Sequence, residues 1–414
     1  MSTSTLSSTV VKDLCKRYSN QEIELLSYSI KNLNESPTGF LGQHEVLSVI
    51  IQTKDQSDPQ ELIFFMKTAP THIASRQKYI EEFNVYKKEV SVYRNLLPKL
   101  QEGQPDISAQ CYYAKDVVLV FEHLGEMEFQ MAADRSGLLD YNHLECALSS
   151  LASLHASSII FEATSQEKIS EMFPEIIKEN TYPSAEVNSA RRDIVNNVVG
   201  ALCEIIKIIP EFRQSNRLEY ILKQFPQEMN RIFDLVKPTK TKYLNVFSHG
   251  DLWANNLLFK YEQDGRPVQC RFVDFQLTRY APPIFDVITL LTISTTKEFR
   301  LQHLDSLLTS YYSMLEYFLR IHGLEINDFL PPKQFEESIN ELKIVGLIQS
   351  CLISHITMFP AELTKKILSD ESFQQDFFKN KRKEICIMTF NSDAVYRSRL
   401  SDMISDFVNS YILN

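Results

Sequence analysis

One stretch decides the fold of this 414-residue chain, residues 247–276, with the sequence FSHGDLWANNLLFKYEQDGRPVQCRFVDFQ. It opens with the triplet His249-Gly250-Asp251, followed by Asn256 five residues after the aspartate. It closes with Asp274 between Val273 and Phe275. Acidic and amide side chains therefore stand at both ends of the segment 251–274.

The middle of this stretch predicts a β-hairpin. Residues 257–261 and 268–273 have the composition of strands, and Gln263-Asp264-Gly265-Arg266 between them is typical of a turn. Because a hairpin brings the outer ends of its strands together, we expect Asn256 and Asp274 to meet at one end. Two oxygen ligands there suit Mg²⁺, which usually takes one or two protein groups together with phosphate oxygens and water.

The spacing of the polar residues is the H-x-D-x-x-x-x-N and D-F-x layout of kinase catalytic loops. Asp251 is placed to accept the proton of a substrate hydroxyl as that oxygen attacks a γ-phosphate. We therefore predict Asp251 and His249 as catalytic residues, and Asn256 and Asp274 as metal ligands. The competing interpretation is a polar loop that only caps a helix and a turn.

Upstream of this stretch, residues 40–122 predict a small β-rich lobe with one main helix. The runs 46–51, 62–66 and 117–121 are of strand type. Between the second and third, residues 76–97 place apolar side chains three or four apart, as one helix face requires. We expect Pro98 to end this helix, since proline disfavours a helical residue before it.

This lobe supplies candidates for the nucleotide site. Lys67 ends the second strand run, and a strand lysine over the α- and β-phosphates is what a kinase requires. Glu82 and Glu89 lie seven residues apart and share a helix face, so either can pair with Lys67; we rank Glu89 first. Gly39 and Gly42 precede the first strand, where glycines let backbone N–H groups approach phosphates, although a plain turn explains them equally well.

After residue 122 the pattern becomes mainly helical, with candidate helices over 141–157, 189–208, 219–236, 285–292, 301–321, 335–357 and 394–413. We place the joint between two lobes, 1–122 and 123–414, at residues 122–125. Glu122 and Leu124 are the joint residues predicted to contact the nucleotide. Asp286, after a Pro-Pro pair, is predicted either to cap a helix or to bond the backbone of the 249–251 loop.

Composition excludes several classes of protein. The net charge is −10, from 43 basic and 53 acidic residues, which argues against a nucleic-acid-binding face. Seven scattered cysteines without a CxxC pair fit free thiols better than disulfides or a zinc site. We found no stretch with the roughly 18 uninterrupted apolar residues of a membrane span, and no signal peptide. The expectation is a cytoplasmic protein; its oligomeric state is open.

At these residues the sequence resembles the insect ecdysteroid kinase-like family, in the choline kinase and aminoglycoside phosphotransferase branch of the protein kinase-like fold. The segments FSHGDLWANNLLF, VDFQLTRYAPPIFDVITLL, and LVFEHL followed by LASLHASS carry the resemblance, which extends from about residue 36 onward. It implies an α+β, two-lobed fold and an enzyme that uses ATP and Mg²⁺. It also implies that Asp251 is the base, Asn256 and Asp274 hold the metal, and Lys67 and Glu89 form the phosphate-binding pair.

The expected activity is transfer of the γ-phosphoryl group of ATP to a hydroxyl of a small, largely apolar acceptor. The resemblance points to an ecdysteroid or related sterol, or to a dietary compound in detoxification. Two alternatives stay open. One is a choline- or aminoglycoside-type kinase with a cationic acceptor, and the other is a catalytically silent sensor of small molecules.

Overall fold

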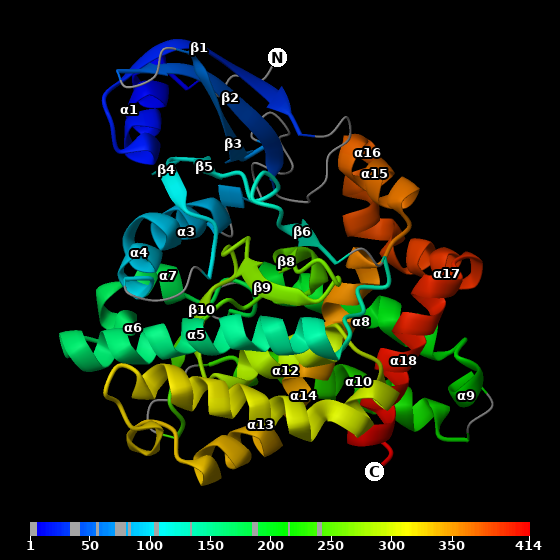
Figure 1. Ribbon diagram of the computed structural model, residues 1–414. Coiled ribbons are helices and arrows are strands. Elements are labelled where there is room, and N and C mark those ends of the chain that lie inside the picture. The colour runs from blue at the N-terminus through cyan, green and yellow to red at the C-terminus, as the bar shows by residue number, and fades with distance from the viewer. Residues whose placement is uncertain are drawn as a thin grey trace.

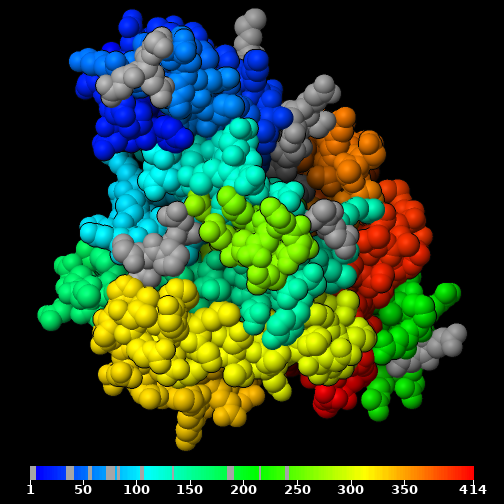
Figure 2. All heavy atoms as spheres, in the orientation of Figure 1, coloured from blue at the N-terminus to red at the C-terminus, as the bar shows by residue number. Residues whose placement is uncertain are grey.

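The structure is a computed structural model that describes residues 6–33, 42–54, 58–70, 80–81, 84–102, 107–132, 135–183, 189–213, 216–237 and 242–414. The chain folds into an N-terminal part built on an antiparallel sheet and a larger, mainly helical C-terminal part (Figure 1). In the space-filling view the N-terminal part caps the rest of the molecule (Figure 2). The predicted α+β class and two-part kinase-like arrangement are confirmed.

The N-terminal sheet has five antiparallel strands in the order β1-β2-β3-β5-β4. The strands are β1 (Ile23–Asn32), β2 (Gln43–Thr53), β3 (Gln60–Thr68), β4 (Cys111–Lys115) and β5 (Val118–Glu122). Inward residues of β2, among them Leu47, Val49 and Ile51, are fully buried, and this alternation holds the sheet against its own small core. The three strands predicted from sequence are β2, β3 and β5.

Three elements of this part escaped prediction: the helix α1 (Ser8–Ser19) and the edge strands β1 and β4. Most residues of β1 are exposed or half-buried, so its sequence lacks the apolar run or the clean alternation that indicates a strand. Its pairing with β2 over the whole strand length, rather than its own composition, stabilises it.

The helix predicted over residues 76–97 differs in the structure. Its regular part is α3 (Val85–Ser91), which begins after Asn84, a residue with φ +54°. A π-helical segment (Val92–Leu96) follows and then α4 (Leu97–Leu100). Pro98 does not end the helix, because it lies in the first turn of α4, where its missing N–H leaves no hydrogen bond unmade.

The C-terminal part is built around α5 (Tyr141–Ser165), which packs against α13 (Lys297–Arg320) and strand β9. The other long helices are α8 (Ser189–Ile206), α10 (Leu218–Asn230), α12 (Ile284–Ile293), α14 (Pro332–Thr357), α17 (Arg382–Ser392) and α18 (Ala394–Tyr411). Shorter helices are α6 (Ile169–Met172), α7 (Pro174–Ile177), α9 (Pro210–Arg213), α11 (Ile232–Leu235), α15 (Ala361–Ser369) and α16 (Glu371–Asp376). Buried α12 lies against α14 at the centre of the main core.

Two small sheets interrupt the helices. The predicted hairpin is present as β8 (Leu257–Tyr261) and β9 (Pro267–Phe272), with β6 (Gln130–Met131) on its other edge. Strands β7 (Val246–Ser248) and β10 (Arg279–Ala281) pair antiparallel and bracket the hairpin in sequence. Because β7 ends directly before His249, these sheets fix where the 249–256 loop begins.

Within the part of the chain that the structure describes, one helix passes a test for membrane spans by length and composition. This is α5, of whose apolar window 67% is buried inside the protein. The pair α14 and α15, bent by 77° at their break, passes only if it is taken as one span. Our search for uninterrupted apolar runs missed α5 because its polar residues break the run. A buried core helix passes the same test, and α5 is such a helix.

Candidate active site

The hairpin brings two predicted metal ligands to one end. In its register Leu257 pairs with Phe272, so Asn256 and Val273 stand directly beyond the last paired residues. The N–H of Val273 donates to the carbonyl oxygen of Asn256 at 3.1 Å, which ties the two strand ends together. Asp274 follows with φ +70°, a backbone conformation that costs an aspartate energy and that clusters at functional sites.

Lys67 joins the sheet, the helix and the hairpin at this end. Its Nζ lies 2.9 Å from Oε1 of Glu89 on α3 and 3.0 Å from Oδ1 of Asp274. Lys67 and Glu89 are almost fully buried, while about a third of the Asp274 side chain is exposed. The structure therefore brings together the predicted lysine, its glutamate and one metal ligand. Glu82, the other candidate partner, lies outside the described residues.

Burial and mutual charge set the proton affinities of this cluster. Burial opposes the charge of Lys67, but the negative charges of Asp274 and Glu89 outweigh it and raise the Lys67 pKa above its usual value. Burial raises the pKa of Glu89 to about 7, although Lys67 acts in the opposite direction. The cluster therefore consists of the buried Lys67 ammonium group between the carboxyl groups of Glu89 and Asp274.

Gln276 is a member of this cluster that the sequence analysis missed. Its Nε2 donates to Oε2 of Glu89 at 3.0 Å, so the residue two after Asp274 holds the second oxygen of the glutamate. The signal was present in the sequence as the third residue of the Asp-Phe-Gln triplet, but a glutamine there has no fixed role until the structure shows what it touches.

Asp251 lies beside Asn256, at the same end of the hairpin as Asp274. Nδ2 of Asn256 donates to the backbone oxygen of Asp251 at 2.8 Å and to its Oδ2 at 3.1 Å. Burial, and then the charge of Asp274, raise the pKa of Asp251 to about 7. A carboxyl group with a pKa near neutrality is well matched to general-base work.

The donor set fits a divalent cation with phosphate. Because the amide nitrogen of Asn256 is used by Asp251, its oxygen is the atom left to coordinate a cation beside Asp274. Among the described residues no group of three or more His, Cys, Asp or Glu side chains is arranged to hold a metal.

Gly250 is required at its position for two reasons. Its φ is +80°, and a Cβ there would collide with the carbonyl oxygen of Leu277 and come within 3.0 Å of Nε of Arg279.

Asp286 binds the backbone of this loop. The backbone N–H groups of His249 and Gly250 donate to Asp286 at 2.7 and 3.0 Å. Of the two arrangements predicted for Asp286, the structure has the bonds to the loop backbone.

The side chain of His249 contacts the backbone of the protein through both ring nitrogens. It is buried, Nε2 lies 3.0 Å from the carbonyl oxygen of Val273, and Nδ1 receives the N–H of Asp251 at 3.3 Å. Burial lowers its pKa and so favours a neutral ring. The imidazole therefore ties the 249–251 loop to the end of β9, and its catalytic role stays a prediction.

A second buried histidine supports Asp286 from below. Nε2 of His155 on α5 lies 3.4 Å from Oδ2 of Asp286, and its Nδ1 lies 2.7 Å from the hydroxyl of Tyr311. Burial raises the pKa of Asp286, but the hydrogen bond and charge of His155 outweigh it, so the pKa is lowered overall. The backbone of the 249–251 loop is therefore held by the ionised carboxylate of Asp286, which His155 holds in turn from the helical core.

Of the two candidate glycines, Gly39 lies outside the described residues. Gly42 is buried, and a Cβ there would come within 3.1 Å of Nε2 of His44 and 3.2 Å of Cε of Lys67. The backbone at Gly42 therefore lies directly against the lysine. His44, paired with Lys67 across β2 and β3, also belongs to this surface, and the sequence analysis did not select it.

The joint residues contact other parts of the protein. The carboxylate of Glu122 accepts the N–H of Gln110 at 2.9 Å and pairs with Arg271 of β9. The N–H of Glu122 donates to the carbonyl oxygen of Gln110 at 3.0 Å, and the side chain of Leu124 is buried in the core. These contacts tie the end of β5 to the hairpin, and nucleotide contact by Glu122 and Leu124 stays a prediction.

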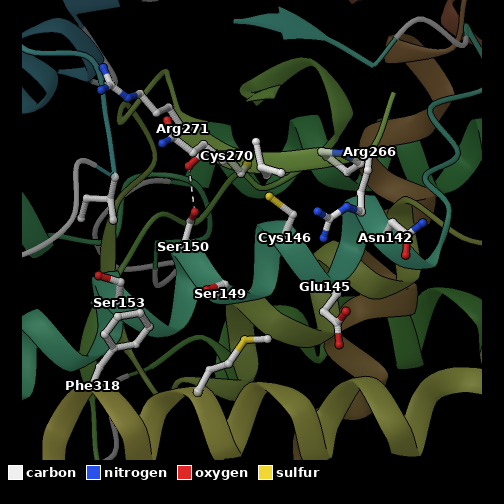
Figure 3. A pocket seen from close by; sticks show the side chains of 15 residues that line it. Asn142, Glu145, Cys146, Ser149, Ser150, Ser153, Arg266, Cys270, Arg271 and Phe318 are labelled. Atoms are coloured by element: carbon white, nitrogen blue, oxygen red, sulfur yellow. Dashed lines mark hydrogen bonds between the residues drawn. The ribbon is translucent and has the colours of Figure 1, made fainter. Parts of the chain in front are cut away.

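A cavity of about 620 Å³ lies beside β9, between α5, β9 and α13. Figure 3 shows Cys146, Ser149 and Ser150 of α5 directed toward β9, with Phe318 of α13 below. The hydroxyl of Ser150 donates to the carbonyl oxygen of Cys270 at 2.7 Å. None of the predicted catalytic or metal-binding residues lines this cavity.

One comparison with known proteins supports the resemblance. A family model described as the ecdysteroid kinase-like family matches residues 44–324. No curated protein matched the chain. Among solved structures, a choline/ethanolamine kinase family protein from Mesorhizobium loti is similar at 10% identity and a TM-score of 0.36, over 89% of this chain and 91% of that one. The family match covers the sheet strands β2 to β5, the catalytic loop and the hairpin.

Proposed function

Because the chain belongs to the ecdysteroid kinase-like family, we propose that it is an ATP- and Mg²⁺-dependent kinase of small molecules that carry a hydroxyl group. The observation that carries the proposal is the convergence of Lys67, Glu89, Asp274, Asn256 and Asp251 at one end of the β8–β9 hairpin. These residues come from the sheet, from α3 and from the hairpin, so their meeting depends on the whole fold.

The chemistry requires few groups from the protein. Asp251 accepts the proton of the acceptor hydroxyl as the new O–P bond to the γ-phosphorus forms and the bond to the bridging oxygen breaks, which releases ADP. Lys67, kept in place by Glu89, is the cation for the phosphate oxygens. Mg²⁺, held by Asn256 and Asp274, supplies charge neutralisation of the phosphates when bound.

The state of Lys67 supports this assignment. In the present arrangement its Nζ already bonds Asp274, so the lysine and the metal ligand share one small volume. A cation and a phosphate that enter this volume would separate the two charges and satisfy both. The carboxyl pKa values near 7 of Asp251 and Glu89 show how strongly the cluster is desolvated.

For the acceptor we propose a hydroxylated, largely apolar molecule, with an ecdysteroid or related sterol first and a dietary compound second. The support is the family. A choline- or aminoglycoside-type kinase and a silent sensor are the alternatives. The presence of all five ionic or amide groups at the site argues against a sensor.

The test is phosphoryl transfer from γ-labelled ATP with Mg²⁺ to a panel of ecdysteroids, plant phenolics and amines. We expect Asp251→Asn to lower turnover by about two orders of magnitude or more, because it loses the positioned proton acceptor, while ATP binding survives. The exposed Asp305→Asn on α13 is the matched control. Near-normal turnover in Asp251→Asn would remove Asp251 from the base role, and absence of ATP binding by the wild type would refute the site.

A further inference from the structure

Arg279, on β10, is a buried arginine with unused hydrogen-bond donors next to the catalytic loop. It is 1% exposed, and neither Nε nor Nη1 has a hydrogen-bond partner among the residues that the structure describes. Nη1 lies 3.4 Å from Oε2 of Glu179, an ion-pair distance without a hydrogen bond. The same side chain lies against Gly250, one residue before Asp251.

Two more unused donors lie beyond Arg279. The Arg279 guanidinium is 5.8 Å from the ring of Tyr182, whose hydroxyl donates to Oε1 of Gln349 at 2.6 Å. Nε2 of the buried Gln349 has no partner within the described part of the chain. Arg192 lies 4.1 Å from the ring of Phe233, which packs edge-on to Tyr182, and its Nε is likewise buried and unpaired with any described residue.

These donors form one connected group around Tyr182, which we call the donor cluster: Arg279, Gln349 and Arg192. The cluster borders the catalytic loop through Arg279, whose Nε lies 3.0 Å from the place that a Cβ on Gly250 would take, one residue before Asp251. An unpaired buried amide or guanidinium group is costly, and native proteins rarely keep several together without a ligand or a functional reason.

We propose that the donor cluster reads oxygen atoms of the phosphoryl acceptor at a distance from the hydroxyl that reacts at Asp251. This inference rests on the proposed kinase function and specifies its acceptor: an apolar molecule with additional hydroxyl, keto or carboxylate oxygens, in contrast to a cationic amine. The cluster offers N–H groups to such oxygens.

The charge and the aromatic faces argue against a cation. A quaternary ammonium site needs open aromatic faces and acidic groups. Here Arg192 lies over Phe233, and Arg279 lies over Phe285 at 4.5 Å and near Tyr182, so protein guanidinium groups already occupy a face of these rings. The one acidic residue paired with Arg279, Glu179, also receives the N–H groups of Thr181 and Tyr182 on its other oxygen.

The experiment compares three acceptors at saturating ATP: ecdysone, which carries several hydroxyls and a ketone, a sterol with a single hydroxyl and no other oxygen, and choline. The enzymes are wild type, Arg279→Met, Arg192→Met and the control Arg266→Met, whose exposed side chain pairs with Glu262 at the hairpin turn. Arg192 is half-buried, so its variant keeps the test alive should Arg279→Met fail to fold. ATP binding and the unfolding midpoint are measured for each.

We expect wild type to prefer ecdysone, and Arg279→Met and Arg192→Met to raise its KM for ecdysone about tenfold or more. The KM for ATP and the Arg266→Met control should stay within twofold, and so should the use of the single-hydroxyl sterol by Arg192→Met. Arg279→Met also removes a cation packed against the catalytic loop, so its kcat should fall with every acceptor. An unchanged KM for ecdysone in both cluster variants, or a preference of wild type for choline, would overturn the inference. Phosphoryl transfer to any of the three acceptors would still support the proposed kinase function.

If wild type binds ATP but phosphorylates none of the three, the proposed function fails for these acceptors, and the inference is judged by calorimetry. Weaker binding of ecdysone to Arg192→Met than to wild type and Arg266→Met would uphold the donor cluster as a binding site. Equal binding in all variants, or none in wild type, would overturn it.

Discussion

Two regions of the β8–β9 hairpin, the side of β9 beside α5 and the end at Asn256, differ in a way that separates a candidate active site from a cavity. The cavity beside α5 has about 620 Å³, ample for a small ligand. The end at Asn256 has Lys67, Glu89, Asp274 and Asp251 within hydrogen-bonding reach of one another or of Asn256. Volume alone would select the cavity, whereas concentrated and desolvated charge selects the end of the hairpin.

Proton affinities sharpen this contrast. At the cavity, burial raises the pKa of the Cys146 thiol to about 11, which leaves it protonated and unreactive near neutral pH. At the metal end, burial and like charges raise the carboxyl pKa values of Asp251 and Glu89 to about 7. Burial thus keeps the thiol at the cavity protonated, whereas at the end of the hairpin it produces carboxyl groups that exchange protons near neutrality.

The largest expected effect is the loss of Asp274, compared with the loss of a carboxylate at the cavity. Asp274→Asn should lower kcat by about 10²–10³-fold, because one charge that holds the cation is removed. Glu145→Gln, which lines the cavity, should leave kcat within twofold. Steady-state phosphoryl transfer measures both. Equal losses of kcat in the two variants would show that the end of the hairpin and the cavity do not differ in their importance for catalysis.

An intermediate effect is expected from pH. Asp251 works as a carboxylate, and its pKa is raised to about 7, so it becomes protonated as the pH falls below about 7. Glu89 becomes protonated over the same range and then releases Lys67. The value of kcat/KM for ATP, which reports groups of the nucleotide-free enzyme, should therefore drop at least tenfold per pH unit on the acid side. A profile that stays flat down to pH 5 would contradict the assignment.

The smallest expected effect concerns stability and uses two glycines with similar backbone angles. Gly250 at the catalytic loop has φ +80°, and Gly265 at the hairpin turn has φ +83°, with nothing within 4 Å of the place that a Cβ would take. Gly265→Ala should cost about 1–2 kcal/mol from backbone conformation alone. Gly250→Ala should cost about 1–3 kcal/mol more, because it collides with Leu277. Urea unfolding midpoints compare them, and equal values would mean that the close approach to Leu277 costs nothing.

The sequence predicted the parts of the fold that have strong local signals. The hairpin was recognisable because two apolar runs flank a turn with Gly265, and both strands lie where we expected them. The long helices α5 and α14 were recognisable from their periodicity. Edge strand β1 was missed because its stability comes from pairing, and the end of the α3–α4 helix was misplaced because a π-helical segment accommodates Pro98.

At the site, motif spacing selected Asp251, Asn256 and Asp274. The end of a strand run selected Lys67, and a helix face selected Glu89; the structure brings these five residues together. Spacing also selected His249, and its place at the joint selected Glu122. In the structure the polar groups of these two side chains bind the protein's own backbone or Arg271. A motif marks which residues belong to the loop, but it does not distinguish a side chain that faces the substrate from one that holds the loop.

By itself, therefore, the sequence determined the residues that carry charge and the order in which strand, helix, loop and hairpin present them, because these depend on local periodicity and spacing. Tertiary structure alone decided which groups remain unpaired. Gln276 reaches Glu89 across 187 positions of chain, and Arg279 comes to lie beside Gly250 and Tyr182. Whether a buried donor finds a partner depends on contacts between distant elements, and no pattern along the chain contains that information.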